Sequence, residues 1–351
     1  MATILTILFV CVAFIAAYYA VKFIEYLLGG DNKSFISLIG ENKKRKLSFD
    51  DEAIAWCANL LTLEKETLKK ILYSDVYLLY KKFRIRKRTG GYRKIACPQK
   101  ELMSIQKTIY NRVLLPVNVH PAATGFRKRM SIIDNVKLHL GKDEIIKTDI
   151  VNFFGSIKQE KVITTFERIG YPANISQVLA ELCCLDGHLP QGAPTSPALS
   201  NIISFEMDKK LTSLSYRYGL SYTRYADDIT LSGYRINPEV VLADIKKAVN
   251  EEGFCLKRKK TRYIGKNRRK LITGISISSG KKLTIPKAKK REIRKNVFFI
   301  LTKGLEEHKR FIKSSDPVYL KRLIYYLYFW KMVEPDNKYV TDSIKSLKKI
   351  Q

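Results

Sequence analysis

The sequence contains no Cys-x-x-Cys pair, and its four His do not stand at zinc-ligand spacing from its six Cys. These absences argue against a structural zinc site. Isolated cysteines are typical of a reducing, cytoplasmic compartment.

The chain also lacks internal repeats and low-complexity tracts, and its predicted strands and helices intermix without a regular βαβ rhythm. We therefore predict the α+β fold class.

Acidic residues are scarce: the 351-residue chain has 33 Asp and Glu against 64 Lys and Arg, for a formal net charge of +31. So large a charge repels itself unless a polyanion neutralises it. Nucleic acid is the first candidate partner and an anionic membrane surface the second. A generically basic, soluble surface is the alternative. The hydrophobic content of 46% allows a sizeable core and argues against wholesale disorder.

A long uncharged run occurs at residues 4–21, and no basic segment precedes it, which argues against a cleaved signal peptide. Its length nearly covers a bilayer core. We predict a hydrophobic, transmembrane helix over residues 1–28, followed by a basic linker over residues 29–46. By the positive-inside rule this linker keeps the bulk of the chain cytoplasmic. A buried core helix or an oligomerising helix is the alternative.

Hydrophobic periodicity predicts helical structure over residues 47–79 and an amphipathic helix over residues 99–115. Between them, residues 81–95 are dense in Lys and Arg around Gly90-Gly91, which indicates a basic β-hairpin. From residue 287 onward the chain is predicted to be helical and basic.

Short strands are predicted at residues 144–150 and 271–277, and two more over residues 222–231, joined at Ala226-Asp227-Asp228. Ser196-Pro197 predicts a helix start with Ser in the capping position. Apolar residues from 199 to 214 then fall on one helical face.

Three carboxylates stand out: Asp149 at the end of a predicted strand, and the adjacent pair Asp227 and Asp228 at a predicted strand turn. Neighbouring carboxylates repel each other, and divalent cations would neutralise them. Hard oxygen ligands suit Mg²⁺, which also binds substrate phosphates. Two metal ions about 3.5–4 Å apart can activate an attacking hydroxyl and stabilise a leaving pyrophosphate. A surface Asp-Asp turn without a catalytic role is the alternative.

A Pro/Gly-rich segment between the two acidic motifs, at residues 189–197, has the sequence Leu-Pro-Gln-Gly-Ala-Pro-Thr-Ser-Pro. Such a segment opening a helix can bring backbone close to a nucleotide and its template base. An ordinary junction between a loop and a helix is the alternative.

The order of the motifs along the chain resembles that of the reverse transcriptase family. The motifs are a basic hairpin with Arg93, Gly125-Phe126-Arg127, Asp149-Ile150-x-x-Phe153-Phe154, Leu-Pro-Gln-Gly, Tyr-Ala-Asp-Asp, Lys260-Thr261 and Ile272-Thr273-Gly274. The resemblance covers residues 81 to 277, with a weaker thumb-like tail to residue 335.

The chain is more closely similar to retron reverse transcriptases, which have an Asn-Ala-x-x-His motif before the first catalytic strand and a Val-Thr-Gly motif after the last. The matching segments here are Asn135-Val136-Lys137-Leu138-His139 and Ile272-Thr273-Gly274. They depart from the retron pattern by Val for Ala and Ile for Val. The N-terminal hydrophobic segment is not a general feature of the family.

The resemblance implies that Asp149, Asp227 and Asp228 are catalytic and bind two Mg²⁺ ions, with the Ile150 carbonyl as a further metal ligand. It also implies an aromatic gate at Phe154, which would exclude a 2′-hydroxyl and so select deoxynucleotides. Plain core packing is the alternative for this ring.

Further nucleotide-binding residues are implied at Gln191, which would touch the incoming nucleotide or the templating base, and at Arg93, which would clamp the triphosphate. Arg127 would contact nucleotide or template, or serve a structural role. Lys260 would act as general acid to the departing pyrophosphate. Asn135 and His139 can share a helix face and would bind RNA. Alternatively, His139 is a satisfied buried imidazole.

The family further implies a right-hand polymerase, with fingers and palm over residues 47–285 and a basic helical thumb over residues 286–351. A retron enzyme copies part of a structured noncoding RNA from an internal guanosine 2′-hydroxyl, with dNTPs as substrates. Its product is a branched RNA–DNA hybrid (msDNA), and its role is antiviral defence with an effector protein. The predicted helix over residues 1–28 would tether this cytoplasmic catalytic domain to the bacterial inner membrane.

Two alternatives stay open at this point. One is a group II intron-like or other defence-associated reverse transcriptase, although the chain shows no C-terminal endonuclease or zinc-finger extension. The other is a catalytically silent, membrane-tethered RNA-binding protein, against which the intact acidic triad argues.

Overall fold

The computed structural model describes residues 48–75, 78–87 and 90–350. The hydrophobic segment 1–28 and the linker 29–46 lie outside these residues, so their predicted structure is not tested. Within the described ranges, no helix combines the length and the apolar character that a membrane crossing requires.

The N-terminal part of the described chain forms two helices, α3 (Asp51–Leu61) and α4 (Lys65–Tyr73), where continuous helical structure over residues 47–79 was expected. Helix α3 ends because Thr62 adopts a left-handed backbone conformation with φ of 57°. Strands β1 (Tyr80–Arg86) and β2 (Tyr92–Pro98) follow as an antiparallel pair, which confirms the basic hairpin. The expected amphipathic helix is α5 (Lys100–Ile109), which continues into the π-helical turn η1 (Tyr110–Leu114).

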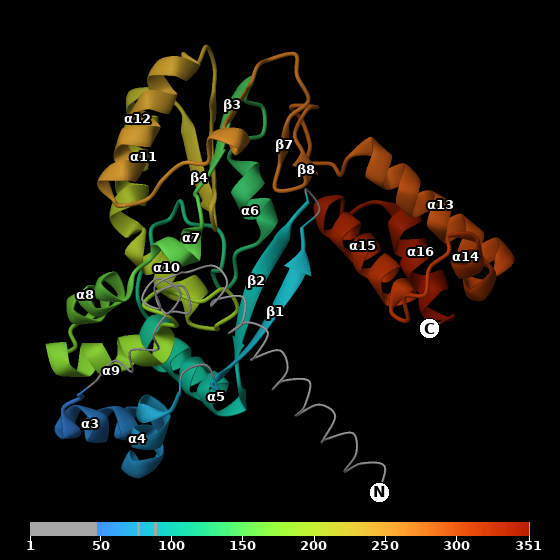
Figure 1. Ribbon diagram of the computed structural model, residues 1–351. Helices are drawn as coiled ribbons and strands as arrows, with labels where there is room; N and C mark the ends of the chain where they lie inside the picture. Colours follow the sequence, from blue (N-terminus) through green and yellow to red (C-terminus); the bar gives the residue numbers. More distant parts are fainter. Residues whose placement is uncertain (1–47, 76–77, 88–89, 351) are drawn as a thin grey trace, which may run out of the picture. The chain divides into compact units, whose positions relative to one another are not determined.

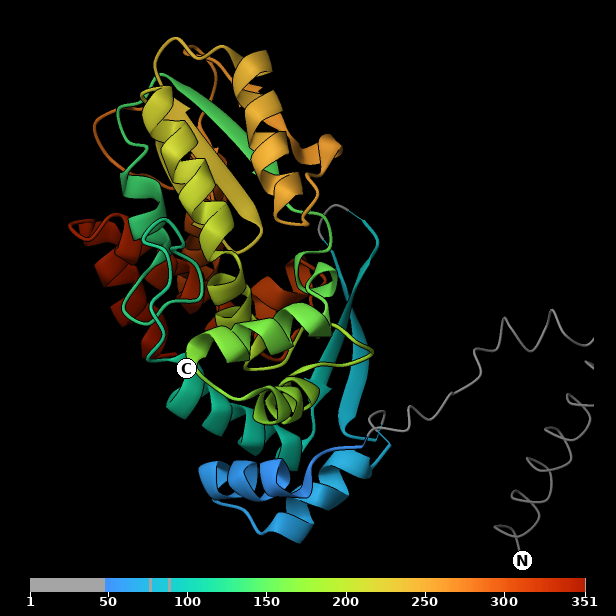
Figure 2. The same cartoon turned by 90° about the vertical axis from the view of Figure 1, so that its left-hand side faces the viewer.

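The centre of the structure is a four-stranded antiparallel sheet with the strand order β4-β5-β3-β6. Its strands are β3 (Glu144–Asp149), β4 (Ser221–Tyr225), β5 (Asp228–Gly233) and β6 (Arg262–Ile264). Helices α11 (Phe205–Arg217) and α12 (Pro238–Glu251) lie on one side of this sheet (Figures 1 and 2). Alternation along the strands turns Ile146 and its register partner Leu231 to one face and Asp149 and Asp228 to the other.

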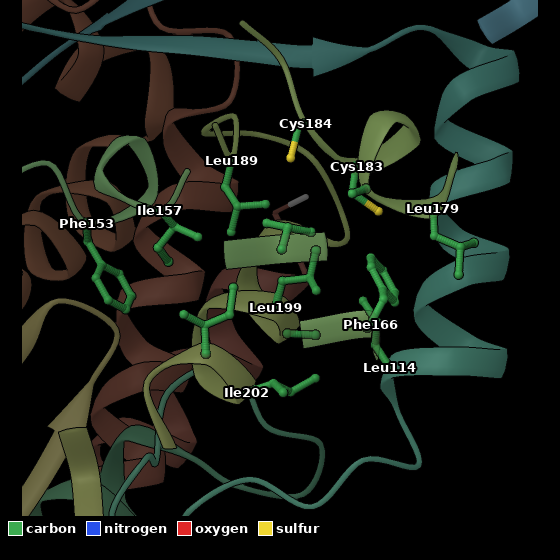
Figure 3. Packing of buried hydrophobic residues seen from close by; sticks show 14 of the residues in the cluster. Leu114, Phe153, Ile157, Phe166, Leu179, Cys183, Cys184, Leu189, Leu199 and Ile202 are labelled. Atoms are coloured by element: carbon green, nitrogen blue, oxygen red, sulfur yellow. The ribbon is translucent and has the colours of Figure 1, made fainter. Parts of the chain in front are cut away.

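A group of helices lies against the start of α11 and the end of α5. These are α7 (Phe153–Ser156), α8 (Gln159–Ile169), α9 (Ala173–Cys183) and α10 (Ser196–Ile203). Buried side chains from this group and from the segment before α10 pack together in Figure 3, among them Phe166, Leu179, Leu189 and Leu199. This packing fixes the start of α10 and therefore the Leu-Pro-Gln-Gly segment that leads into it.

The start of α10 differs from the expectation. Thr195 occupies the cap position, and Ser196 is the first helical residue. The Ser196 hydroxyl donates to the Pro190 carbonyl at 2.8 Å, so it fastens the preceding loop and does not cap the helix. The helical run expected from residue 199 to 214 is also interrupted, because Ser204 separates α10 from α11.

The segment 271–277 forms a hairpin of two short strands, β7 (Leu271–Ile272) and β8 (Ile275–Ser276), and not the single strand predicted from the sequence. The chain reverses because Thr273 and Gly274 both adopt positive φ, at 44° and 90°. The predicted C-terminal helices are α13 (Lys287–Lys303), α14 (Leu305–Phe311), α15 (Tyr319–Val333) and α16 (Lys338–Lys348).

Two hydrophobic cores meet at strand β3. Ile146 belongs to the larger core, which also contains buried hydrophobic residues of α3 to α5 and of α7 to α12. Its neighbour Ile145 belongs to a second core with α13, α15 and α16. A single strand therefore connects both cores, and it ends in Asp149.

Candidate active site

Asp149 stands directly opposite Asp228 across the antiparallel strands β3 and β5. Cβ atoms in such a pair lie roughly 4.5–5.5 Å apart, and like charges at these positions destabilise a sheet. The Asp227 carbonyl accepts a hydrogen bond of 3.0 Å from the Ile150 amide, which ties the strand turn to the end of β3. The structure thus brings together the three carboxylates that the sequence singled out.

The carboxyl groups at this end of the sheet are partly buried and lie close enough to repel one another. Burial raises the pKa of Asp227 to about 6, and repulsion from Asp149 and Asp228 adds to the shift. Burial also raises the pKa of Asp228, although attraction to Lys147 opposes this shift. Burial and repulsion between neighbouring carboxylates therefore both disfavour the charged forms of Asp227 and Asp228.

Two lysines flank the carboxylates. The Lys260 ammonium forms an ion pair with Asp149, whose side chain is only 5% exposed, whereas that of Lys260 is 50% exposed. Burial disfavours the Lys260 charge, but the hydrogen bond to Asp149 and attraction to all three carboxylates outweigh it, so the pKa of Lys260 is raised. Lys147 lies two residues before Asp149 on the same face of β3, and its ammonium donates to the Leu271 carbonyl at 3.2 Å.

A close backbone contact supports the Tyr225-Ala226 turn. Ala226 adopts a left-handed conformation with φ of 57°. The Thr124 amide donates to the Arg224 carbonyl at 2.8 Å, so the segment before Gly125 runs alongside the end of β4. A Cβ atom on Gly125 would lie 2.7 Å from the Ala226 nitrogen, a distance that real Cβ contacts essentially never show. Only glycine fits at position 125 without moving the turn.

A buried ion pair holds the same turn from the other face of the sheet. Arg224 and Asp208 both have 0% exposed side chains, and two hydrogen bonds of 2.7 and 2.6 Å join them. The Arg224 guanidinium also donates to the Ala226 carbonyl at 3.0 Å. It donates to the Asn201 side chain at 3.1 Å, and Asn201 in turn donates to the Gly125 carbonyl at 2.8 Å. Arg224 therefore positions the residue that precedes Asp227.

This network, the position of Lys147 beside the carboxylates and the role of Gly125 were not predicted from the sequence. One signal was present: Arg224 alternates with Tyr222 on the inward face of a predicted strand, where a charged residue requires a partner. The partner, Asp208, comes from a helix, so the strand pattern gave no means of finding it.

The donor set of the cluster fits divalent cations. Carboxylate oxygens, with the nearby Ile150 carbonyl, are hard ligands of the kind that Mg²⁺ prefers. Burial is the main cause that raises the pKa of Asp227 and of Asp228, and a bound cation would favour the charged form of both carboxylates. Among the described residues, however, no three His, Cys, Asp or Glu side chains converge as a ready-made metal site. Metal binding would therefore require these carboxylates to turn toward a common ion.

Phe154 lies near the carboxylates in sequence and packs at the edge of the core. Its ring is partly buried, and its centroid lies 5.6 Å from that of Phe153 and 6.0 Å from that of Phe126. The Phe126 side chain is 42% exposed. Phe126 and Phe154 thus form an aromatic pair at the edge of the core, in which Phe126 is exposed to solvent.

Gln191 contacts the basic hairpin through its backbone, whose carbonyl accepts a hydrogen bond of 2.9 Å from the Ala96 amide. A Cβ atom on Gly192 would lie 2.9 Å from the Ile95 side chain, so Ile95 reaches this loop. Arg93 is exposed and shares the Ile95 face of β2. The structure therefore places Arg93 and Gln191 on adjoining segments.

Arg127 is half-buried, and its guanidinium makes one long hydrogen bond, of 3.4 Å, to the Ala123 carbonyl. It lines a small cavity of about 210 Å³ together with Phe126, Asn201 and residues of η1. The structural role left open for this residue agrees with that placement, and contact with a nucleotide or template stays a prediction.

Asn135 and His139 are both buried, on and just after α6 (Ile132–Lys137). The His139 ring contacts the hydroxyls of Ser232 and Thr223 at 2.7 and 2.8 Å, and burial lowers its pKa to about 3. The alternative of a satisfied, neutral imidazole agrees with this geometry. In this conformation neither side chain reaches solvent, so direct RNA contact is not open to them and any role in RNA binding would be indirect.

Comparison with known proteins gives a consistent result. Residues 85–277 match the family described as reverse transcriptase (RNA-dependent DNA polymerase). The chain is 35% identical over 271 residues to the retron Ec86 reverse transcriptase of Escherichia coli, covering 75% of this chain and 84% of that protein. It is 29% identical over 320 residues to the retron Ec83 reverse transcriptase of Escherichia coli, covering 82% and 98%.

Among solved structures, the chain is similar to a telomerase from Candida albicans that was solved with a fragment of telomeric RNA. The TM-score is 0.42 at 12% sequence identity, over 77% of this chain and 63% of that chain.

Proposed function

Because this chain belongs to the reverse transcriptase family and is a retron-type RNA-directed DNA polymerase, we propose that Asp149, Asp227 and Asp228 form its nucleotidyl-transfer centre. The observation that supports this assignment is the direct pairing of Asp149 with Asp228 across β3 and β5, with Asp227 in the adjoining turn. The reaction joins the α-phosphate of a dNTP to the primer hydroxyl and releases pyrophosphate.

Divalent metal ions are general to this family, and we propose two Mg²⁺ ions here, held by the three carboxylates and the Ile150 carbonyl. Bound there, they would supply the charge that activates the attacking hydroxyl and stabilises the leaving group. The protein's contribution is to hold the carboxylates in place, through the Arg224–Asp208 pair on one face and Gly125 beside the turn.

Lys260 is suited to the proposed role of general acid. Its raised pKa keeps the ammonium charged at neutral pH, and its half-exposed side chain can turn from Asp149 to a phosphate oxygen. A proton delivered from the Lys260 ammonium would neutralise developing charge on the departing pyrophosphate.

The remaining nucleotide contacts are assigned from position. Arg93 is exposed on the Ile95 face of the hairpin and would bind the triphosphate. Gln191, on the adjoining loop, would contact the incoming nucleotide or templating base. Phe154 would exclude a ribose 2′-hydroxyl by its bulk. In this assignment the sheet is the palm, the β1–β2 hairpin belongs to the fingers, and α13 to α16 form the thumb.

The retron assignment carries further proposals. The partner is a structured noncoding RNA that serves as template and primer, and the product is a branched RNA–DNA hybrid that starts from a guanosine 2′-hydroxyl. Antiviral defence with an effector protein is the proposed role. Tethering of a cytoplasmic catalytic domain to the bacterial inner membrane stays a prediction, because residues 1–28 lie outside the described residues.

Primer extension on an RNA template tests the catalytic proposal. Wild-type protein with Mg²⁺ and dNTPs should extend a DNA primer, and Asp227→Asn should not, because the variant removes one charged oxygen ligand. Glu239→Gln, which removes an exposed carboxylate on α12, is the matched control and should extend normally. Extension by Asp227→Asn at the wild-type rate would refute the assignment.

Sequencing the nucleic acid that co-purifies with the protein tests the retron proposals, for which a covalent RNA–DNA species is expected.

A further inference from the structure

The β1–β2 hairpin has two faces of different chemistry. Alternation and strand pairing place Lys81, Phe83, Ile85, Arg93 and Ile95 on one face, and Ile95 reaches the Leu-Pro-Gln-Gly loop. The opposite face also holds Ala96 opposite Lys82, and we call its five polar or aromatic residues the outer hairpin face: Lys82, Arg84, Arg86, Tyr92 and Lys94. All five of these side chains are exposed.

The outer hairpin face concentrates positive charge at a cost to the hairpin. Arg84 and Lys94 are directly paired across the two strands, and like charges at opposed positions are destabilising. Lys82 and Arg86 extend the charge to either side along β1. The Lys82 ammonium lies 3.7 Å from the Asp186 carboxylate, whereas Arg84, Arg86 and Lys94 form no ion pair with any described residue.

The strands themselves provide no counter-charge, since neither β1 nor β2 contains an acidic residue. A lone two-stranded ribbon is at best marginally stable in water, so a repelling cationic pair in its middle is an unfavourable arrangement for the free protein. A run of phosphates laid along this face would remove the repulsion and release counter-ions. The exposed Tyr92 ring adds a surface on which a base can stack.

We infer that the outer hairpin face binds the phosphate backbone of RNA that lies outside the template–primer duplex. This inference rests on the proposed function only in that the chain binds RNA. It adds a second contact, on the face opposite to Arg93, that holds the uncopied part of the RNA while the other face adjoins the loop of Gln191. The phosphates could come from either side of the copied region, and the experiment separates these sources.

The test compares Arg84→Gln/Arg86→Gln/Lys94→Gln with a control of equal charge, Lys209→Gln/Lys246→Gln/Lys247→Gln. The control changes three exposed lysines on α11 and α12. Fluorescence anisotropy without dNTPs measures binding to a blunt RNA–DNA duplex, to the same duplex with a single-stranded 5′ template extension, and to the same duplex with a structured 3′ RNA extension.

The hairpin variant should lose on the order of tenfold in affinity for one of the extended RNAs relative to the blunt duplex, and the arm that shows the loss identifies the source. Its plot of log affinity against log salt should be less steep by about 2 units for that RNA, as three lost phosphate contacts require. An equal loss on all three substrates, an equal loss in the control, or no loss would overturn the inference.

Thermal unfolding of the free proteins guards against a folding defect. Removing the opposed Arg84–Lys94 charges should leave the melting temperature of the hairpin variant equal to or above that of wild type. A lower melting temperature would show that these cations support the fold and would overturn the argument. Failure of the proposed function is recognised separately, because it would appear as absent primer extension in wild type.

Discussion

The Asn135 side-chain amide donates a hydrogen bond of 3.4 Å to the Thr273 hydroxyl. This contact joins the two segments, residues 135–139 and 272–274, on which the resemblance to retron enzymes rests. The Asn135 side-chain oxygen also accepts a hydrogen bond of 3.0 Å from the Thr124 hydroxyl, next to Gly125 and the Tyr225-Ala226 turn. The two segments therefore connect the β7–β8 hairpin with the end of β4.

Replacing Asn135 by Ala should destabilise the protein by roughly 1–3 kcal/mol, because the buried Thr124 hydroxyl and the half-buried Thr273 hydroxyl each lose a partner. Urea unfolding measures this loss, with the exposed Asn250→Ala on α12 as the control. At temperatures where the variant is folded, its affinity for RNA should stay within about twofold of wild type. A selective loss of RNA affinity with unchanged stability would show that Asn135 contacts RNA directly.

His139 should make stability fall as the solution becomes acidic. Its pKa of about 3 in the folded protein lies below the ordinary value of 6.5, so the unfolded chain takes up a proton that the folded protein refuses. The contribution of the neutral His139 ring to the free energy of unfolding is therefore fully present above pH 6.5. It is lost as the pH falls toward 3, by up to about 1.4 kcal/mol per pH unit.

His139→Gln keeps hydrogen-bonding capacity and removes the titration. Between pH 6.5 and 5, the slope of unfolding free energy against pH should therefore be shallower in this variant, whereas His188→Gln, at an exposed position, should retain the wild-type slope. Chemical denaturation at several pH values provides the measurement. Parallel slopes for wild type and His139→Gln would contradict the assignment of a neutral buried imidazole.

The Arg224–Asp208 ion pair should be essential for the stability of the protein. Arg224 should also be needed for activity, because it holds the Ala226 carbonyl. Asp208→Asn leaves the fully buried guanidinium without a counter-charge and should cost roughly 3–5 kcal/mol. Lys210→Met, which removes exposed ion pairs with Glu251 and Glu252, should cost far less, because solvent screens such pairs. Urea unfolding compares the two.

The double variant Arg224→Met/Asp208→Leu separates positioning from folding. Apolar replacement of both partners should recover part of the stability that Asp208→Asn loses, although the buried Tyr222 hydroxyl, which donates to Asp208 at 2.7 Å, loses its acceptor. Primer extension should stay slow, because the Ala226 carbonyl still lacks the donor that Arg224 provides. A stable double variant with wild-type kcat would show that the ion pair does not position the turn.

Asp227→Asn should stabilise the metal-free protein while abolishing polymerisation. The pKa of Asp227 is raised from 3.8 to about 6, so its contribution to stability is fully present below pH 3.8 and is lost as the pH rises through about 6. At pH 7.5 the amide should stabilise the fold by roughly 1–3 kcal/mol. Chelator-treated wild type and variant should unfold more nearly alike at pH 5. A variant less stable than wild type at pH 7.5 would contradict this electrostatic picture.

Much of this site followed from local sequence. The Gly90-Gly91 pair between basic runs predicted the hairpin, because both glycines adopt the positive φ that such turns require. The strands on either side of Asp227-Asp228 followed from their alternation, and the carboxylates themselves stood out as repelling charges. These features depend on residues that lie close together in the chain.

The features that the sequence did not reveal depend on tertiary packing. The chain reverses at Thr273, and threonine has no preference for such turns. The sequence therefore predicted one strand where the structure has β7 and β8. The Ser196 hydroxyl donates a hydrogen bond to the Pro190 carbonyl in the preceding loop, so it does not cap helix α10 as the sequence predicted. The burial of His139 depends on hydroxyls of two strands that come more than 80 residues later in the chain.

Strand β3 presents Ile145 to one core and Ile146 to the other, so the C-terminal helices are not an appended module. A fragment that stops before Lys287 would leave Ile145 and the β7–β8 hairpin facing water at the strand that delivers Asp149. Minimal versions of this enzyme, whether for biochemistry or for engineering, should therefore keep the chain from residue 49 to its last helix in one piece.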